Sequence, residues 1–101
     1  MKEAIIINQG RANPPYFHII QPISADICVN DEVRCINPKT HVVLTGVVTE
    51  HDWIFDWNDV PRGWILGIWG VEPKLLRNVL LLTDPRFRDD WARVILIKEI
   101  T

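Results

Sequence analysis

Hydrophobic and polar positions alternate most clearly on either side of one short polar segment. In Glu32–Ile36, Val33 and Cys35 alternate with their neighbours, which is typical of a strand with one face in solvent. Asn37–Thr40 follows, with an asparagine that can bond to its own backbone and a proline with a fixed φ, so a turn is predicted. His41–Thr49 is then predicted to return as a long strand, which completes a hairpin.

Three further apolar runs also predict strands. Glu3–Asn8 contains three consecutive isoleucines and is expected to be buried on both faces. Tyr16–Ile20 is a shorter strand that Pro22 ends, and the loop before it covers Gly10–Pro15. Arg93–Ile100 contains four consecutive aliphatic residues, which is typical of a buried strand.

The clearest helix is predicted over Glu72–Leu82, where Pro73 opens the first turn. Lys74, Arg77 and Asn78 are expected on its solvent side, and Asp84 with Pro85 ends it. Its apolar residues recur with helical spacing and form one stripe: Leu75, Leu76, Val79, Leu80 and Thr83.

The pattern leaves several segments open. Ser24–Val29 is either one helical turn or a short strand, and residues 61–70 are either a helix, with Asp59 as its cap, or a strand. Gly46 predicts a bulge or a sharp bend inside its strand. In a helix, three glycines would form a bare face against which another backbone could pack: Gly63, Gly67 and Gly70.

Composition and charge narrow the class of protein. A chain of 101 residues with 48% hydrophobic residues is expected to form a single domain, spanning residues 1–101. A net charge of −2 argues against a broad basic surface for nucleic acid, although it leaves room for a local site. No apolar run is long enough for a membrane span. Two cysteines without a secretory leader suggest a reducing, cytoplasmic location.

Residues 29–34 read Val-Asn-Asp-Glu-Val-Arg and resemble the "hydrophobic-Gly-Asp-x-hydrophobic" entry to a strand found in the PUA-like superfamily. The hairpin over residues 37–48 and the closing strand Arg93–Ile100 resemble the same family of small RNA-binding barrels, and its ASCH branch most of all. The Gly-x-Lys-x-x-Thr-x-Arg pattern of ASCH proteins is absent from this sequence, and Gly10-Arg11, which lacks the lysine and threonine spacing, is the nearest basic stretch. The resemblance implies an α+β fold, a small mixed β-barrel with one or two helices packed against it, and RNA as the ligand class.

The segment Glu50–Asn58 supplies the main candidate site, because its aromatic residues alternate with other residues as in an extended strand. Bases stack on indole rings, and arginine can hold a phosphate through two hydrogen bonds. We therefore predict a non-catalytic module for RNA or a nucleotide-like ligand. The candidate ligand-binding residues are Arg11, Arg34, Lys39, Trp53, Trp57 and Arg62.

A simpler interpretation is that the two indoles cover the core and that the cations are solvated. The acidic neighbours also disfavour a phosphate at this segment: Glu50, Asp52, Asp56 and Asp59. A second alternative is an interaction protein that forms a homodimer through the apolar segment Trp64–Trp69.

Metal and catalytic sites are weaker candidates. The possible metal ligands lack the close spacing of a structural zinc site, so no metal or cofactor is predicted: Cys28, Cys35, His41, His51 and Asp52. A carboxylate of Glu50 or Asp52 beside Trp53 could have a raised pKa if it is buried, and His51 could serve as a base, but no nucleophile is evident.

Overall fold

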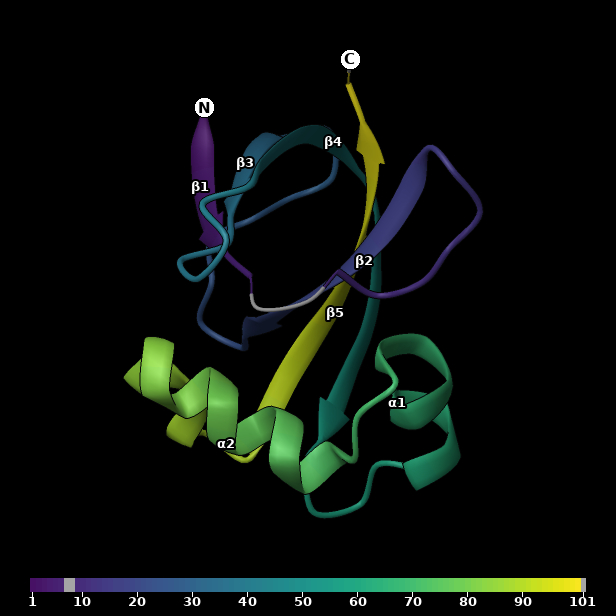
Figure 1. Ribbon diagram of the computed structural model, residues 1–101, viewed down its shortest axis with the longest axis vertical. Coiled ribbons are helices and arrows are strands. Elements are labelled where there is room, and N and C mark those ends of the chain that lie inside the picture. The colour runs from purple at the N-terminus through teal and green to yellow at the C-terminus, as the bar shows by residue number, and fades with distance from the viewer. Residues whose placement is uncertain (7–8, 101) are drawn as a thin grey trace.

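The computed structural model describes residues 1–6 and 9–100, without the side chains of residues 51 and 52. In this part of the chain, five strands form one mixed sheet and two α-helices pack at one end of it (Figure 1), which confirms the α+β class. Neither helix here has the length and apolar character that a membrane crossing requires. The elements are β1 (Lys2–Ile5), β2 (Tyr16–Pro22), β3 (Glu32–Ile36), β4 (Val43–Asp56), α1 (Arg62–Trp69), α2 (Pro73–Thr83), the 3-10 helix η1 (Pro85–Arg88) and β5 (Trp91–Glu99).

The sheet has the strand order β1-β3-β4-β5-β2. β1 pairs with β3 in parallel, and every other neighbouring pair is antiparallel. Among the described residues, β1 and β2 are therefore the outermost strands in this order, and closure into a barrel stays a prediction. One side chain reaches from edge to edge, because the buried Gln21 donates from Nε2 to the carbonyl oxygens of Ile20, at 2.8 Å, and Ile5, at 3.4 Å.

Apolar side chains on the two faces of the sheet form two separate clusters. Along β5, Ala92 and Val94 face the helices, whereas Ile95 and Ile97 face the inside of the curved sheet. The first cluster contains Ala4, Ile6, Phe17, Ile19, Ala25, Ile27, Val33, Cys35, Val48, Ile95 and Ile97. The second cluster joins the sheet to the helices, which lie at the lower end of Figure 1. It contains Ile20, Phe55, Trp57, Ile65, Trp69, Leu76, Leu80, Phe87, Ala92 and Val94.

The predicted hairpin is confirmed. β3 spans the predicted residues, with Val33 and Cys35 fully buried. In the turn, the Asn37 side-chain oxygen accepts hydrogen bonds from the backbone N–H groups of Lys39, at 2.9 Å, and Thr40, at 3.2 Å. The alternation and the turn chemistry are both local properties, which is why the sequence was enough to locate them.

The first strand is not buried on both faces, contrary to the prediction from its isoleucines. β1 is an edge strand in which Ala4 is buried and Ile5 is 45% exposed. The core covers only one face of this edge, so alternate residues remain in solvent. The last two residues of the predicted range Glu3–Asn8 lie outside the described residues.

Gly46 was predicted to mark a bulge or a sharp bend, and of these the bulge is wrong. Gly46 pairs in register on both sides, and the two irregularities of β4 lie later, within residues 48–53. A Cβ atom at Gly46 would collide with the side chain of Ile97 and would lie 2.6 Å from the Lys98 carbonyl oxygen. The glycine is needed because β4 and β5 approach each other closely at this point.

Ser24–Val29 forms neither a helical turn nor a strand. Two of its carbonyl groups are instead bound by a side chain from β5, since the Arg93 guanidinium donates to Ala25 O and, at 2.7 Å, to Ile27 O. A bond that joins residues so far apart in the chain leaves no local sequence signal.

Residues 61–70, left open by the sequence, form the helix α1, which ends at Gly70 in the left-handed conformation with φ of 70°. Asp59 does not cap it, because Pro61 occupies the N-cap and the Asp59 N–H bonds to the Asp56 carbonyl oxygen at 3.0 Å. A Cβ built on Gly63 or Gly67 would meet no atom within 4 Å, so the bare face of α1 points to open space.

The helix α2 confirms the predicted Glu72–Leu82 helix, with two corrections to its faces. Leu76 and Leu80 are buried as expected, but Leu75 is 58% exposed. Arg77, expected in solvent, is only partly exposed and donates to the carbonyl oxygens of residues 87–89 at 3.1–3.4 Å. This side chain attaches η1 to α2.

The close approach at Gly46 makes a testable difference between glycines. We expect Gly46→Ala to lower the free energy of unfolding by about 1–3 kcal/mol, because the added methyl group has no room beside β5. The matched control is Gly63→Ala, which should be neutral or stabilising by up to about 1 kcal/mol because alanine favours a helix. Urea denaturation of both variants measures the difference, and equal stability would contradict the β4–β5 geometry.

Candidate functional site

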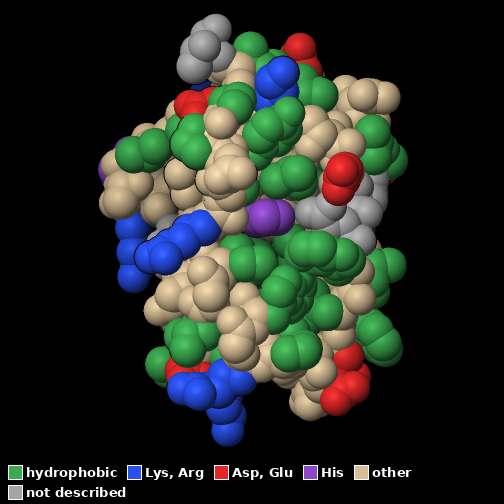
Figure 2. Space-filling view, turned by 90° about the vertical axis from the view of Figure 1, so that its right-hand side faces the viewer, with side chains coloured by type: hydrophobic (Ala, Val, Ile, Leu, Met, Phe, Trp, Pro, Cys, Tyr) green, Lys and Arg blue, Asp and Glu red, His purple; other side chains and the backbone are tan. Residues whose placement is uncertain are grey.

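An aromatic cluster forms where the second half of β4 faces α1. Side-chain alternation places Trp53, Phe55 and Trp57 on one face of β4, and α1 brings Trp64 and Trp69 over them. Ring centroids lie 4.8 Å apart for Phe55 and Trp57 and 5.5 Å apart for Phe55 and Trp64, in edge-to-face contacts. Figure 2 shows hydrophobic side chains over this side of the molecule, with one group directly below the histidine near its centre.

Trp53 lies at the outer end of the cluster. Its indole is 47% exposed, although it contacts two other rings. The Trp64 ring meets it edge-on, with centroids 4.9 Å apart, and the His18 ring of β2 lies nearly parallel to it at 6.2 Å. Trp53 therefore presents an exposed aromatic surface that its neighbours hold in place.

Trp57, the other predicted stacking residue, lies inside the cluster. Its side chain is only 8% exposed and packs edge-on against Phe55. Its indole N–H has no hydrogen-bond partner among the described residues. Trp53 is therefore the more exposed ring of the predicted pair, whereas Trp57 lines a separate hollow of about 330 Å³ together with Arg62.

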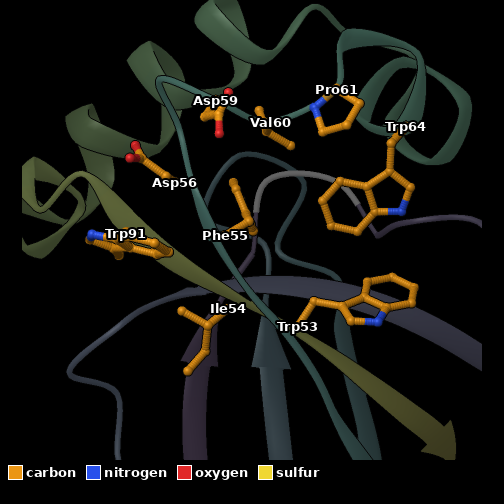
Figure 3. A pocket seen from close by; sticks show the side chains of 9 residues that line it. All are labelled: Trp53, Ile54, Phe55, Asp56, Asp59, Val60, Pro61, Trp64 and Trp91. Carbon is orange, nitrogen blue, oxygen red and sulfur yellow. The ribbon is translucent and has the colours of Figure 1, made fainter.

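A hollow of about 360 Å³ lies beside Trp53 at the edge of the sheet (Figure 3). Asp56 and Asp59 are among its lining residues, and within the described part of the chain no lysine or arginine lines it. The hollow is thus apolar with an acidic rim. Its lining residues are Trp53, Ile54, Phe55, Asp56, Asp59, Val60, Pro61, Trp64 and Trp91.

Arg11 is the predicted cation that the structure brings towards Trp53. Its backbone N–H donates to Ile68 O of α1 at 2.9 Å, and its carbonyl oxygen lies 2.9 Å from Nδ1 of His18. His18 is the ring beside Trp53, so Arg11 and Trp53 belong to one region of the surface. Figure 2 shows a basic side chain next to a histidine, above the hydrophobic area.

The other predicted cations lie elsewhere. Arg34 is exposed on β3, within 4.0 Å of a carboxylate of β1, and Lys39 lies in the turn before β4. Arg62 donates from Nε to both carboxylate oxygens of Glu72, at 2.7 and 2.8 Å, and this bond lowers the pKa of Glu72. The structure does not bring Arg34, Lys39 or Arg62 together with Trp53.

Three aromatic residues of this region were not among the predicted ligand-binding residues: His18, Trp64 and Trp91. Trp91 lies before the predicted closing strand Arg93–Ile100, whereas in the structure it begins β5 and pairs with Asp56. Its position directly before the apolar run of the last strand was the available signal. His18 lies next to Trp53 only because β5 separates β2 from β4, which no local pattern reports.

The apolar segment Trp64–Trp69, proposed as a dimer surface, is largely covered within the monomer. Ile65 is fully buried and Trp69 is 7% exposed, whereas Trp64, Leu66 and Ile68 are partly exposed. The homodimer stays a prediction.

Metal and acid–base chemistry receive no positive support. Among the residues that the structure describes, no three histidine, cysteine or acidic side chains form a group able to hold a metal ion. The side chains of His51 and Asp52 lie outside the described part, so the acid–base hypothesis that includes Glu50 stays untested.

The two cysteines are expected to differ sharply in reactivity. Burial raises the pKa of the Cys35 thiol to about 12, so at pH 8 it stays protonated as well as inaccessible, whereas Cys28 is exposed. A chromogenic disulfide reagent should modify one thiol quickly in the native protein and two after denaturation. The variant Cys28→Ala should lose the fast reaction. Two fast thiols in the native protein would contradict the burial of Cys35.

No protein-family model matches the chain, and neither does any curated protein or solved structure. The function of the site must therefore be inferred from its own residues. The site contains the Trp53 indole, which is held in place and nearly half exposed. Arg11 lies beyond His18 on one side of it, and the hollow lined by Asp56 and Asp59 lies on the other.

Proposed function

We propose that the protein is a non-catalytic binding module for single-stranded RNA or a nucleotide-like ligand, with one base stacked on Trp53. The observation that carries this proposal is the half-exposed Trp53 ring, held by Trp64 and His18. Stacking of a base on an aromatic side chain contributes about 1–3 kcal/mol. A ring that is already fixed loses little conformational entropy when a ligand binds.

The charges indicate how such a ligand would lie. A phosphate would be repelled by Asp56 and Asp59 on the hollow side of Trp53. On the other side, beyond His18, Arg11 supplies an exposed cation. The phosphates would therefore run past His18 towards Arg11, and this local site does not need a basic protein overall.

The resemblance to the PUA-like superfamily supports the same ligand class. The chain contains, in this order, a hairpin, a long strand, helices and a closing strand, and this order resembles that of the superfamily. The proposal includes two further points. The curved sheet closes into a PUA-like barrel, and the protein is cytoplasmic.

Substitution of the exposed indole tests the proposal. A labelled single-stranded RNA of about ten nucleotides should bind with a Kd below about 1 mM, and Trp53→Ala should weaken binding roughly 5- to 150-fold, the equivalent of a lost stacking contact. Fluorescence anisotropy of the label avoids interference from the other tryptophans. Trp53→Phe should retain most of the affinity, and Val43→Ala, an exposed apolar position at the other end of β4, should change nothing.

A second set of variants separates this site from the one predicted from the sequence. Arg11→Ala should weaken binding and reduce its salt dependence. Arg34→Ala and Lys39→Ala should leave both unchanged, because Arg34 pairs with Thr45 near the start of β4 and Lys39 lies in the turn before it, whereas Trp53 lies near the other end of that strand. No RNA or nucleotide binding, or an unchanged Kd for Trp53→Ala, would overturn the proposal.

A further inference from the structure

The second half of β4 is an open edge of the sheet. β3 pairs with β4 only as far as Val47, and Val48 bonds to the backbone of residues 30 and 31. Beyond this point, β5 is the one strand that pairs with β4 in the described part of the chain. The opposite side of residues 53–56 therefore has none of the described strands beside it.

The hydrogen-bond pattern shows which backbone groups face this edge. The Trp57 N–H donates to Asp90 O at 2.8 Å, so in the antiparallel register Phe55 also bonds to β5, opposite Ala92. The backbone groups of the alternate residues, Ile54 and Asp56, point away from β5. The N–H and C=O of Ile54 and the N–H of Asp56 consequently face outward, whereas the Asp56 carbonyl oxygen accepts the Asp59 N–H.

Exposed apolar side chains flank these backbone groups. Trp53 is 47% exposed, Ile54 is 64% exposed and Trp91 is 48% exposed. Natural proteins usually protect an open strand edge with charges, proline or a covering segment, because it can pair with another chain. Figure 3 shows Ile54 and Trp91 on one side of β4 and Trp53 and Trp64 on the other.

The charge of the hollow selects the kind of chain that would pair there. Asp56 and Asp59 lie along it, and among the described residues no lysine or arginine lines it. Indole rings also attract ammonium and guanidinium groups through their faces. Both features favour a basic side chain and disfavour an acidic one.

We propose that the outer edge of β4 at Ile54 binds an extended, lysine- or arginine-bearing segment of a partner protein as an added strand. One residue of that segment exchanges two backbone hydrogen bonds with Ile54. Its neighbours project to alternate faces, where basic side chains meet the carboxylates of Asp56 and Asp59 and the exposed indoles. This activity goes beyond RNA binding, and Arg11 and His18 take no part in it.

The test uses a defined probe, a blocked six-residue peptide that alternates lysine and valine. It should bind with a Kd below about 1 mM and at least about tenfold more tightly than the same peptide with glutamate in place of lysine. In amide NMR spectra, the largest shifts should fall on Ile54 and Asp56. Methylation of the peptide's backbone nitrogens should abolish binding without any change to the protein, because the added strand can no longer donate.

Variants then separate this site from the RNA site. Asp59→Asn and Trp91→Ala should each weaken the lysine peptide several-fold, whereas Arg11→Ala should weaken RNA and leave the peptide unchanged. The proposal is overturned if the glutamate peptide binds as well, if the methylated peptide still binds, or if the shifts fall elsewhere. Light scattering that detects a dimer disrupted by Ile54→Lys would assign the edge to a second copy and would also overturn it.

Discussion

The antiparallel pairing of β4 with β5 is the interaction on which the rest of the structure depends. It runs from Gly46 opposite Glu99 to Asp56 opposite Trp91 and separates the two apolar clusters. Because β4 continues well beyond the end of β3, its second half has β5 on one side and an open edge on the other. Both proposed sites follow from this extension, one at the Trp53 ring and the other at the outward backbone of Ile54.

Much of the fold could be predicted because it follows from local patterns. The alternation of Val33 and Cys35, the Asn37 turn and the helical stripe with Leu76 and Leu80 are all encoded within a few residues. The failures involve long-range contacts. Burial of β1 depends on its place at the edge of the sheet, the role of Gly46 depends on β5, and residues 24–29 depend on Arg93.

The site was harder to predict for the same reason. Alternation along residues 50–58 correctly placed Trp53 and Trp57 on one face, but it could not show that the second apolar cluster buries Trp57 and leaves Trp53 half exposed. It also gave no sign that β5 would bring Trp91 to the end of β4 or that β2 would place His18 beside Trp53. The sequence could name Arg11, Arg34, Lys39 and Arg62 as candidate cations. Only the tertiary structure shows that Arg11 lies in the region of Trp53 and that the other three do not.

Hydrogen exchange of the β4 amides, followed by NMR on the free protein, tests the central claim most directly. If the second half of β4 pairs only with β5, the amides of Phe55 and Trp57 are protected while those of Ile54 and Asp56 exchange quickly, in strict alternation. Protection of all four amides would mean that the edge is already covered. Fast exchange of all four would mean that the β4–β5 pairing does not extend this far, and either result would contradict the account.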